Sequence, residues 1–89
     1  MKTTYQNSNV ATETPAELRG SAEALIARKG ITGSDAAAIR TCDYEQIAGL
    51  TSEDAECARA VGHFANACYA FSVGHLAYAR DQLTLTTLA

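Results

Sequence analysis

Tryptophan is absent from this chain of 89 residues, proline occurs once, and no cluster of basic residues is present. Because helix breakers are this rare and strong helix formers such as alanine are frequent, we expect an all-α fold. The missing basic cluster argues against nucleic-acid binding, since contacts with phosphates need grouped Lys and Arg side chains. The length suits one small domain.

The cysteines also lack the spacings of known site types. The chain has three cysteines, an odd number, at Cys42, Cys57 and Cys68. It contains no C-x-x-C, H-x-x-x-H or E-x-x-H pattern, which would place two metal ligands on one helical turn. Cys57 and Cys68 would lie about 16 Å apart on a helix, too far for a mutual disulfide. We therefore expect reduced thiols in a cytoplasmic protein without metal or cofactor. We expect no signal peptide, because Lys2 is not followed by an apolar segment.

No catalytic fingerprint is present either, because the chain has no glycine-rich phosphate loop, paired-carboxylate cleft or oriented triad. We expect a protein that is not an enzyme. Cys68 and His75 lie about 10.5 Å apart along one helix, so they could meet only across an interface between chains. The simpler interpretation is a buried apolar cysteine and a histidine that sets helix register.

Local signals divide the chain into a flexible polar arm at 1–13 and a single helical domain at 14–89. Thr14 and Pro15 are typical of a helix start, and Gly30 of a helix end. Ser34 or Asp35 would cap the second helix, and Asp43 the third. We expect helices at 15–29, 35–41 and 44–49, and a dominant C-terminal helix from Thr51 to about Asp81. The fold class is thus an all-α bundle of about four helices.

The C-terminal helix carries the most regular pattern. Residues with apolar or small side chains recur at alternating spacings of four and three, which is the pattern of a helix packed along its length against another helix. These residues are Cys57, Val61, Phe64, Cys68, Phe71, His75, Tyr78 and Gln82. Small residues such as Ala65 and Ala67 flank them and favour a close contact. Gly62 and Gly74, both expected in mid-helix, indicate close backbone approach at two points.

We assign a predicted seam to this helix and expect it to form a homodimer. Its residues are Val61, Phe64, Ala67, Cys68, Phe71, Gly74, His75 and Tyr78. The stretch 60–79 has no charged residue and is long enough to span a bilayer. However, it contains polar side chains such as His63 and Asn66, its apolar content is mostly alanine, and no basic cluster flanks it, so we expect no membrane span.

Charge is unevenly distributed. Residues 31–56 carry a net charge of −5, whereas 1–30 and 57–89 each carry +1, which together give −3. Acidic residues suit helix starts, which explains where most of them stand. This preference does not explain why Arg40 is the one basic residue in the segment 31–56. The acidic segment therefore favours a protein partner with a basic surface.

The first functional hypothesis is a small acidic protein-binding module that occludes or modulates a partner. Small inhibitors and antitoxin-like proteins encoded by phages or mobile elements act in this way, an analogy of size and charge alone. The expected partner-binding residues are Asp43, Glu45, Glu53, Asp54, Glu56, Arg59, His63 and Asn66. The alternatives are a structural oligomer-forming subunit, and a metal or thiol-redox protein that uses Cys68 and His75 across an interface.

Overall fold

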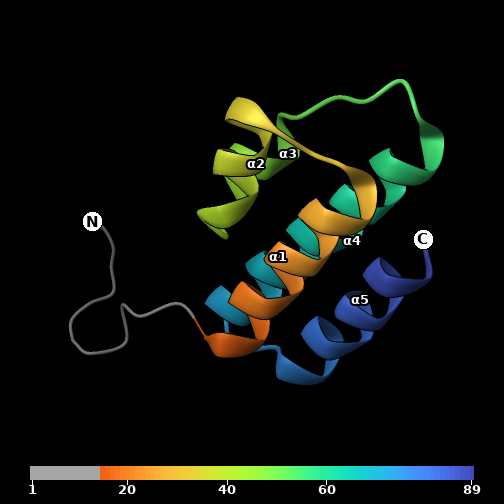
Figure 1. Cartoon of the computed structure of the whole chain (residues 1–89). Helices are drawn as coiled ribbons and strands as arrows, with labels where there is room; N and C mark the ends of the chain where they lie inside the picture. The colour runs from red at the N-terminus through yellow and green to blue at the C-terminus, as the bar shows by residue number, and fades with distance from the viewer. Residues whose placement is uncertain (1–14) are drawn as a thin grey trace.

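A computed structural model of the chain describes residues 15–89, in which helices are the only regular elements (Figure 1). They are α1 (Ala16–Lys29), α2 (Gly33–Arg40), α3 (Tyr44–Ala48), α4 (Ala55–Ser72) and α5 (Leu76–Leu88). The all-α prediction is confirmed, with five helices in this part of the chain instead of about four. The predicted arm at 1–13 and the predicted cap Thr14 lie outside the described residues.

Helix α1 follows its sequence signals closely. The Pro15 carbonyl accepts hydrogen bonds from the backbone N–H groups of Leu18 and Arg19, both at 3.1 Å. At the other end Gly30 adopts the left-handed conformation with φ +64°, which lets its own N–H and that of Ile31 reach the Ile26 carbonyl. The predicted boundaries of 15–29 are therefore correct to within one residue.

The two short helices are also found where the pattern predicts them. The Asp43 carboxylate accepts a hydrogen bond from the Glu45 N–H at 3.1 Å, as expected of a helix cap. Helix α2 begins two residues earlier than predicted, with Thr32 instead of Ser34 or Asp35 at the cap position and no side-chain capping bond.

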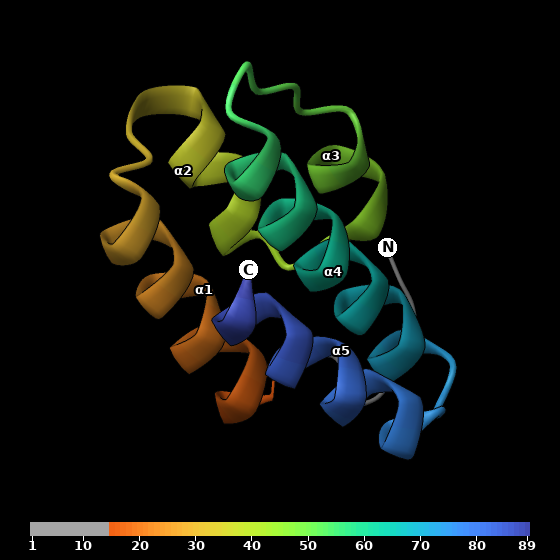
Figure 2. The same ribbon diagram turned by 90° about the vertical axis from the view of Figure 1, so that its right-hand side faces the viewer.

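The prediction of one long C-terminal helix is wrong. The helix breaks at Val73, Gly74 and His75, and α5 then runs antiparallel to α4 (Figure 2). Gly74 has a φ of +83°, a backbone conformation that L-amino acids with a side chain rarely adopt. The reversal is closed by a hydrogen bond of 2.9 Å from the His75 N–H to the Ala70 carbonyl. The start also differs, because Asp54 caps a helix that begins at Ala55 instead of Thr51.

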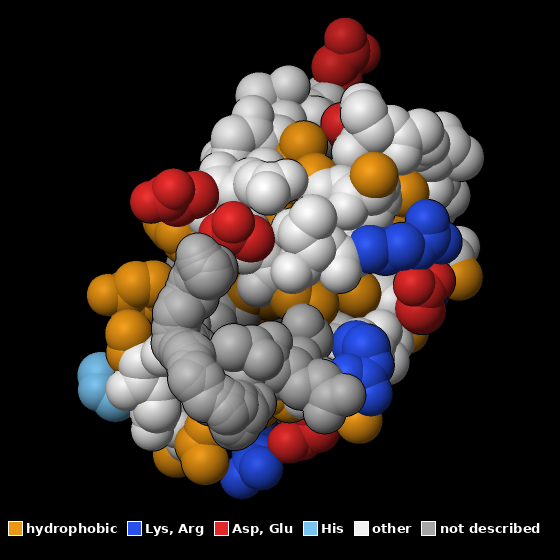
Figure 3. Space-filling model, turned by 90° about the vertical axis from the view of Figure 1, so that its left-hand side faces the viewer, with side chains coloured by type: hydrophobic (Ala, Val, Ile, Leu, Met, Phe, Trp, Pro, Cys, Tyr) orange, Lys and Arg blue, Asp and Glu red, His pale blue; other side chains and the backbone are white. Residues whose placement is uncertain are grey.

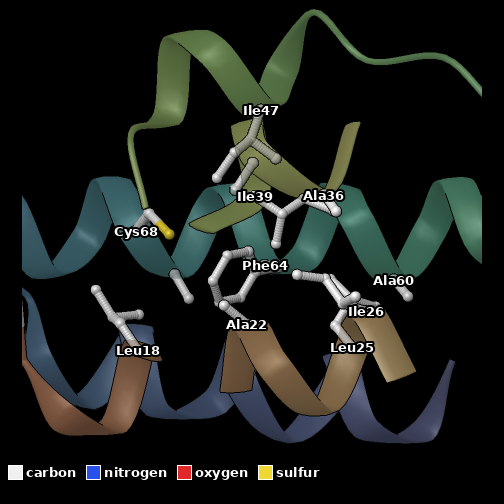
Figure 4. Close-up of a cluster of buried hydrophobic side chains, with 12 residues drawn as sticks. Leu18, Ala22, Leu25, Ile26, Ala36, Ile39, Ile47, Ala60, Phe64 and Cys68 are labelled. Atoms are coloured by element: carbon white, nitrogen blue, oxygen red, sulfur yellow. The ribbon is translucent and has the colours of Figure 1, made fainter. Parts of the chain in front are cut away.

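Helix α4 forms the centre of the fold. Its most extensive contact is with α5, and α1 and α3 also pack against it. Figure 4 shows the Phe64 ring between the side chains of α1 on one side and those of α2 and α3 on the other. Phe64, Ala60 and Ala67 have no exposed surface. The expected close packing of small residues is therefore present, but between helices of the same chain.

The two helix glycines play different parts from those predicted. A Cβ atom built on Gly62 or on Gly74 would meet no heavy atom within 4 Å. The predicted close backbone approach at these two positions is therefore wrong. Gly62 is exposed on α4, and Gly74 provides the left-handed turn that reverses the chain.

Polar contacts join the first and last helices. Arg28 and Lys29, in the last turn of α1, donate hydrogen bonds to the carbonyls of Thr86 and Ala89 at 3.0 and 2.9 Å. Cations suit these carbonyls because the C-terminal end of a helix carries partial negative charge. At the start of α1, the Glu17 carboxylate accepts two hydrogen bonds, of 3.0 and 3.1 Å, from the exposed Arg80 of α5, with which it forms an ion pair. Across residues 15–89 no helix is both long and apolar enough to cross a membrane.

Candidate functional site

An open groove lies where the start of α3 meets the last turns of α4. Its volume is about 530 Å³. The groove is lined by Cys42, Asp43, Tyr44, Glu45, Cys68, Tyr69 and Ser72. Asp43 and Glu45 belong to the predicted partner-binding set and Cys68 to the predicted seam, so the fold brings together residues that the sequence analysis kept apart.

Cys42 stands in the turn between α2 and α3 in an unusual backbone conformation. Its φ of +55° makes it the one residue other than glycine with a positive φ among residues 15–89. Such a conformation costs a residue with a Cβ about 1–2 kcal/mol. Its N–H donates to the Ile39 carbonyl at 3.1 Å, which holds the turn at the end of α2. The side chain is half-buried at the groove.

Cys68 meets Cys42 from α4. The Cys68 thiol, acting as a hydrogen-bond donor, lowers the pKa of Cys42; burial partly opposes this effect, and the positive charge of Arg19 adds to it. The same hydrogen bond raises the pKa of Cys68 as the donor, and its burial and the nearby charges reinforce the rise. Figure 4 shows the Cys68 sulfur beside the segment that joins α2 to α3. The pair thus combines one thiol that ionises more readily with one that stays protonated.

Two tyrosines and the acidic side chains form the rim of the groove. The rings of Tyr44 and Tyr69 lie 5.6 Å apart between centroids at an interplanar angle of 60°, and they are 39% and 54% exposed. A tilted arrangement at this distance is favourable for aromatic pairs. Figure 3 shows hydrophobic and acidic side chains next to one another along one edge of the molecule. This mixture is typical of protein-binding surfaces.

The predicted partner-binding residues fall into three groups in the structure. Asp43 and Glu45 lie at the groove. A second exposed group stands around the start of α4 and consists of Glu53, Asp54, Glu56 and Arg59. Since about 14 residues of helix separate this group from Tyr69, roughly 20 Å lies between the two. His63 and Asn66 form the third group and are partly buried, with Nδ1 and Nδ2 at 2.9 and 3.4 Å from the Gln82 side-chain oxygen on α5.

The predicted seam is divided by the turn at Gly74. Phe64, Ala67 and Cys68 are buried within the chain's own core. Val61 and Phe71 are partly buried, whereas Gly74, His75 and Tyr78 are exposed in the turn and on α5. The α4 portion of the seam is therefore covered by helices of the same chain.

Cys68 and His75 do not belong to one site in this fold. Cys68 is buried against Cys42, and His75 is exposed at the start of α5. Within residues 15–89 no three His, Cys, Asp or Glu side chains converge in a geometry that could hold a metal ion. The Cys42–Cys68 pair could not be predicted from the sequence, because the two residues lie on separate elements and no local spacing relates them.

Comparison with protein-family models, with curated proteins and with solved structures finds no match to this chain. The function must therefore be inferred from the chemistry of the groove and of the surface around it.

Proposed function

We propose that the chain is a small acidic protein-binding module that occludes or modulates a partner with a basic surface. The observation that carries the proposal is how the charges are paired. In the described part of the chain, Glu17 and Glu23 form ion pairs with Arg80 and Arg40. Glu45, Glu53 and Glu56 are exposed and form no ion pair with residues 15–89.

Four of the basic residues are engaged elsewhere in the fold. Arg28 and Lys29 bind carbonyls of α5, and Arg40 and Arg80 hold carboxylates of α1. The five acids around α3 and the start of α4 therefore outnumber Arg59, the basic residue that stands among them. Such a surface speeds the approach of a basic partner and disfavours acidic ones, including nucleic acids.

The tyrosine pair supports placing the centre of the contact at the groove. Tyr44 and Tyr69 supply apolar surface with a polar tip, which is the chemistry of residues that dominate binding energy at interfaces. Asp43 and Glu45 stand directly beside them. The acids at the start of α4 would then contribute long-range attraction more than direct contact.

Two double variants of equal charge test the proposal. Glu45→Gln with Glu56→Gln removes two negative charges from the proposed surface, and Asp35→Asn with Asp81→Asn removes two from elsewhere. The wild-type chain is used to capture proteins from cells that produce it, and the affinity of the purified partner is then measured by calorimetry at several salt concentrations.

We expect the first double variant to weaken binding by about tenfold or more, and the control by less than about threefold. Tyr69→Ala should weaken binding further, and salt should weaken it throughout. A partner whose affinity is equal for both double variants and insensitive to salt would contradict the proposal.

One observation favours the alternative of an oligomer-forming subunit. Tyr78, Leu85 and Leu88 on α5 are exposed large hydrophobic residues, although the α4 part of the predicted seam is covered. Light scattering on a sizing column at several concentrations decides this alternative. A mass near twice 9.4 kDa that Tyr78→Ala with Leu85→Ala returns to the monomer value would support it, and a constant monomer mass would exclude it.

A further inference from the structure

The two thiols in the groove have features that a purely structural pair of cysteines would not need. Cys42 adopts a left-handed backbone, a conformation better suited to glycine or asparagine, and its side chain lines the same groove as Cys68. Both residues line an open groove, so a small molecule can approach the pair from solvent.

We infer that Cys42 and Cys68 form a reversible oxidation site, in which a peroxide-class oxidant converts the two thiols of the groove into an intramolecular disulfide. Cys42, half-buried at the groove, is the residue that reacts with the oxidant. Cys68, buried in α4, is the residue that resolves the intermediate. The inference stands independently of the proposed binding function.

The chemistry balances with hydrogen peroxide as the oxidant. The Cys42 thiolate attacks one peroxide oxygen, the O–O bond breaks, and the departing hydroxide takes up a proton to become water, which leaves a sulfenic acid on Cys42. The Cys68 sulfur then attacks the Cys42 sulfur, the S–O bond breaks, and the hydroxide leaves as water with the proton of Cys68. Two thiols have lost two electrons, and one peroxide has become two waters.

The surroundings of the pair suit the two roles. The hydrogen bond from Cys68 and the charge of Arg19 both favour the thiolate of Cys42, which is the form that attacks peroxide. Since the two thiols line the same groove and influence each other's pKa, side-chain rotations can bring the two sulfurs to bonding distance.

Cys57 provides an internal comparison. It is half-buried near the start of α4 and lines a separate cavity of about 240 Å³ that also includes Ile39 and Leu50. Eleven residues of α4 separate it from Cys68, which is about 16 Å along the helix. Cys57 has no second thiol nearby in the described structure and should remain reduced, or oxidise without forming a bond within the chain.

The test treats the reduced full chain with equimolar hydrogen peroxide, followed by alkylation of the remaining thiols and intact mass measurement. Digestion after basic residues and after glutamate separates the three cysteines, because Cys42 falls in 41–45, Cys57 in 57–59 and Cys68 in 60–80. The variants are Cys57→Ser as the matched control, and Cys42→Ser and Cys68→Ala, which each remove one member of the pair. Circular dichroism checks that each variant is folded.

We expect the wild type and Cys57→Ser to lose two hydrogen atoms on oxidation and to regain them with dithiothreitol. The amount of the disulfide-linked peptides 41–45 and 60–80 should exceed that of any other linked pair by at least ~10-fold. Cys42→Ser and Cys68→Ala should show no linkage within the chain. Linkage through Cys57, linkage between chains, or irreversible oxidation of Cys42 beside an unreacted Cys68 would overturn the inference. Because wild type and Cys57→Ser suffice for these outcomes, the test holds even if a variant fails to fold.

Discussion

Helices α4 and α5 lie side by side but differ in what they bury. Helix α4 buries Phe64 and a set of alanines between neighbours on several sides. Helix α5 buries Ala79, Gln82 and Thr86, and leaves Tyr78 and Leu85 exposed. The same apolar spacing runs through both helices, yet α4 lies at the centre of the core and α5 packs at its edge. Spacing alone therefore does not measure how deeply a helix is buried.

The polar residues of the hairpin show why α5 belongs where it is. The Gln82 side-chain oxygen is 2.9 Å from His63 Nδ1 and 3.4 Å from Asn66 Nδ2, so the oxygen of this buried amide has its hydrogen-bond partners on α4. The Thr86 hydroxyl donates to the Gln82 carbonyl at 2.8 Å within its own helix. These bonds allow α5 to place polar side chains against α4.

The largest expected effect separates the two halves of the predicted seam. Phe64→Ala should lower the free energy of unfolding by about 3–5 kcal/mol, because it leaves a cavity in the centre of the core. Tyr78→Ala, at a side chain that is 51% exposed, should change it by no more than about 0.5 kcal/mol. Urea denaturation measures both. Similar losses at the two positions would indicate that the seam is one continuous interface.

A second pair of variants tests close packing between helices. Ala67→Leu should lower the free energy of unfolding by about 1–3 kcal/mol, because Ala67 has no exposed surface and the added atoms have no space. Ala77→Leu, on the exposed side of α5, should stay within about 0.5 kcal/mol. If Ala67→Leu left the urea midpoint unchanged, α4 would not be closely packed.

The two glycines should respond in opposite directions. Gly74→Ala forces a side chain into a left-handed conformation and should destabilise the chain by about 1–2 kcal/mol. Gly62→Ala, at an open helical position, should stabilise it by about 0.5–1 kcal/mol. Thermal denaturation of both variants at one pH is sufficient. Stabilisation by both substitutions would argue for one unbroken helix.

The smallest effect concerns the ion pairs that flank α1. Hydrogen bonds from Arg80 and Arg40 lower the pKa of the Glu17 and Glu23 carboxyls below their ordinary 4.5. A lowered pKa gives stability that is present above about pH 4.5 and is lost as the pH falls through the folded-state value. Replacing both with Gln should therefore flatten the fall in melting temperature below pH 4.5, and added salt should reduce the difference. The control is Ala77→Gln, which places the same side chain at an exposed position without removing a carboxyl and should keep the wild-type slope.

The helix boundaries differ in how far local signals could locate them. Asp43 and Gly30 act within three or four residues of themselves, so their capping roles could be predicted from the sequence. The turn at Gly74 could not, because glycine also occurs inside α4 at Gly62 and only tertiary packing distinguishes the two. The acids of the candidate surface were likewise identified as charged, but their division into separate groups follows from how α3 packs on α4.

The sequence by itself determined the all-helical character, the roles of Gly30 and Asp43 at helix ends and the uneven distribution of charge, because each depends on residues close together in the chain. Only the tertiary structure decided that the seam folds back on itself, which cations pair with which carboxylates, and that Cys42 meets Cys68 in an open groove. The ion pairs among these features join residues 17 and 63 positions apart, Glu23 with Arg40 and Glu17 with Arg80. Contacts of that range form when apolar faces pack together, and no local preference of the chain encodes them.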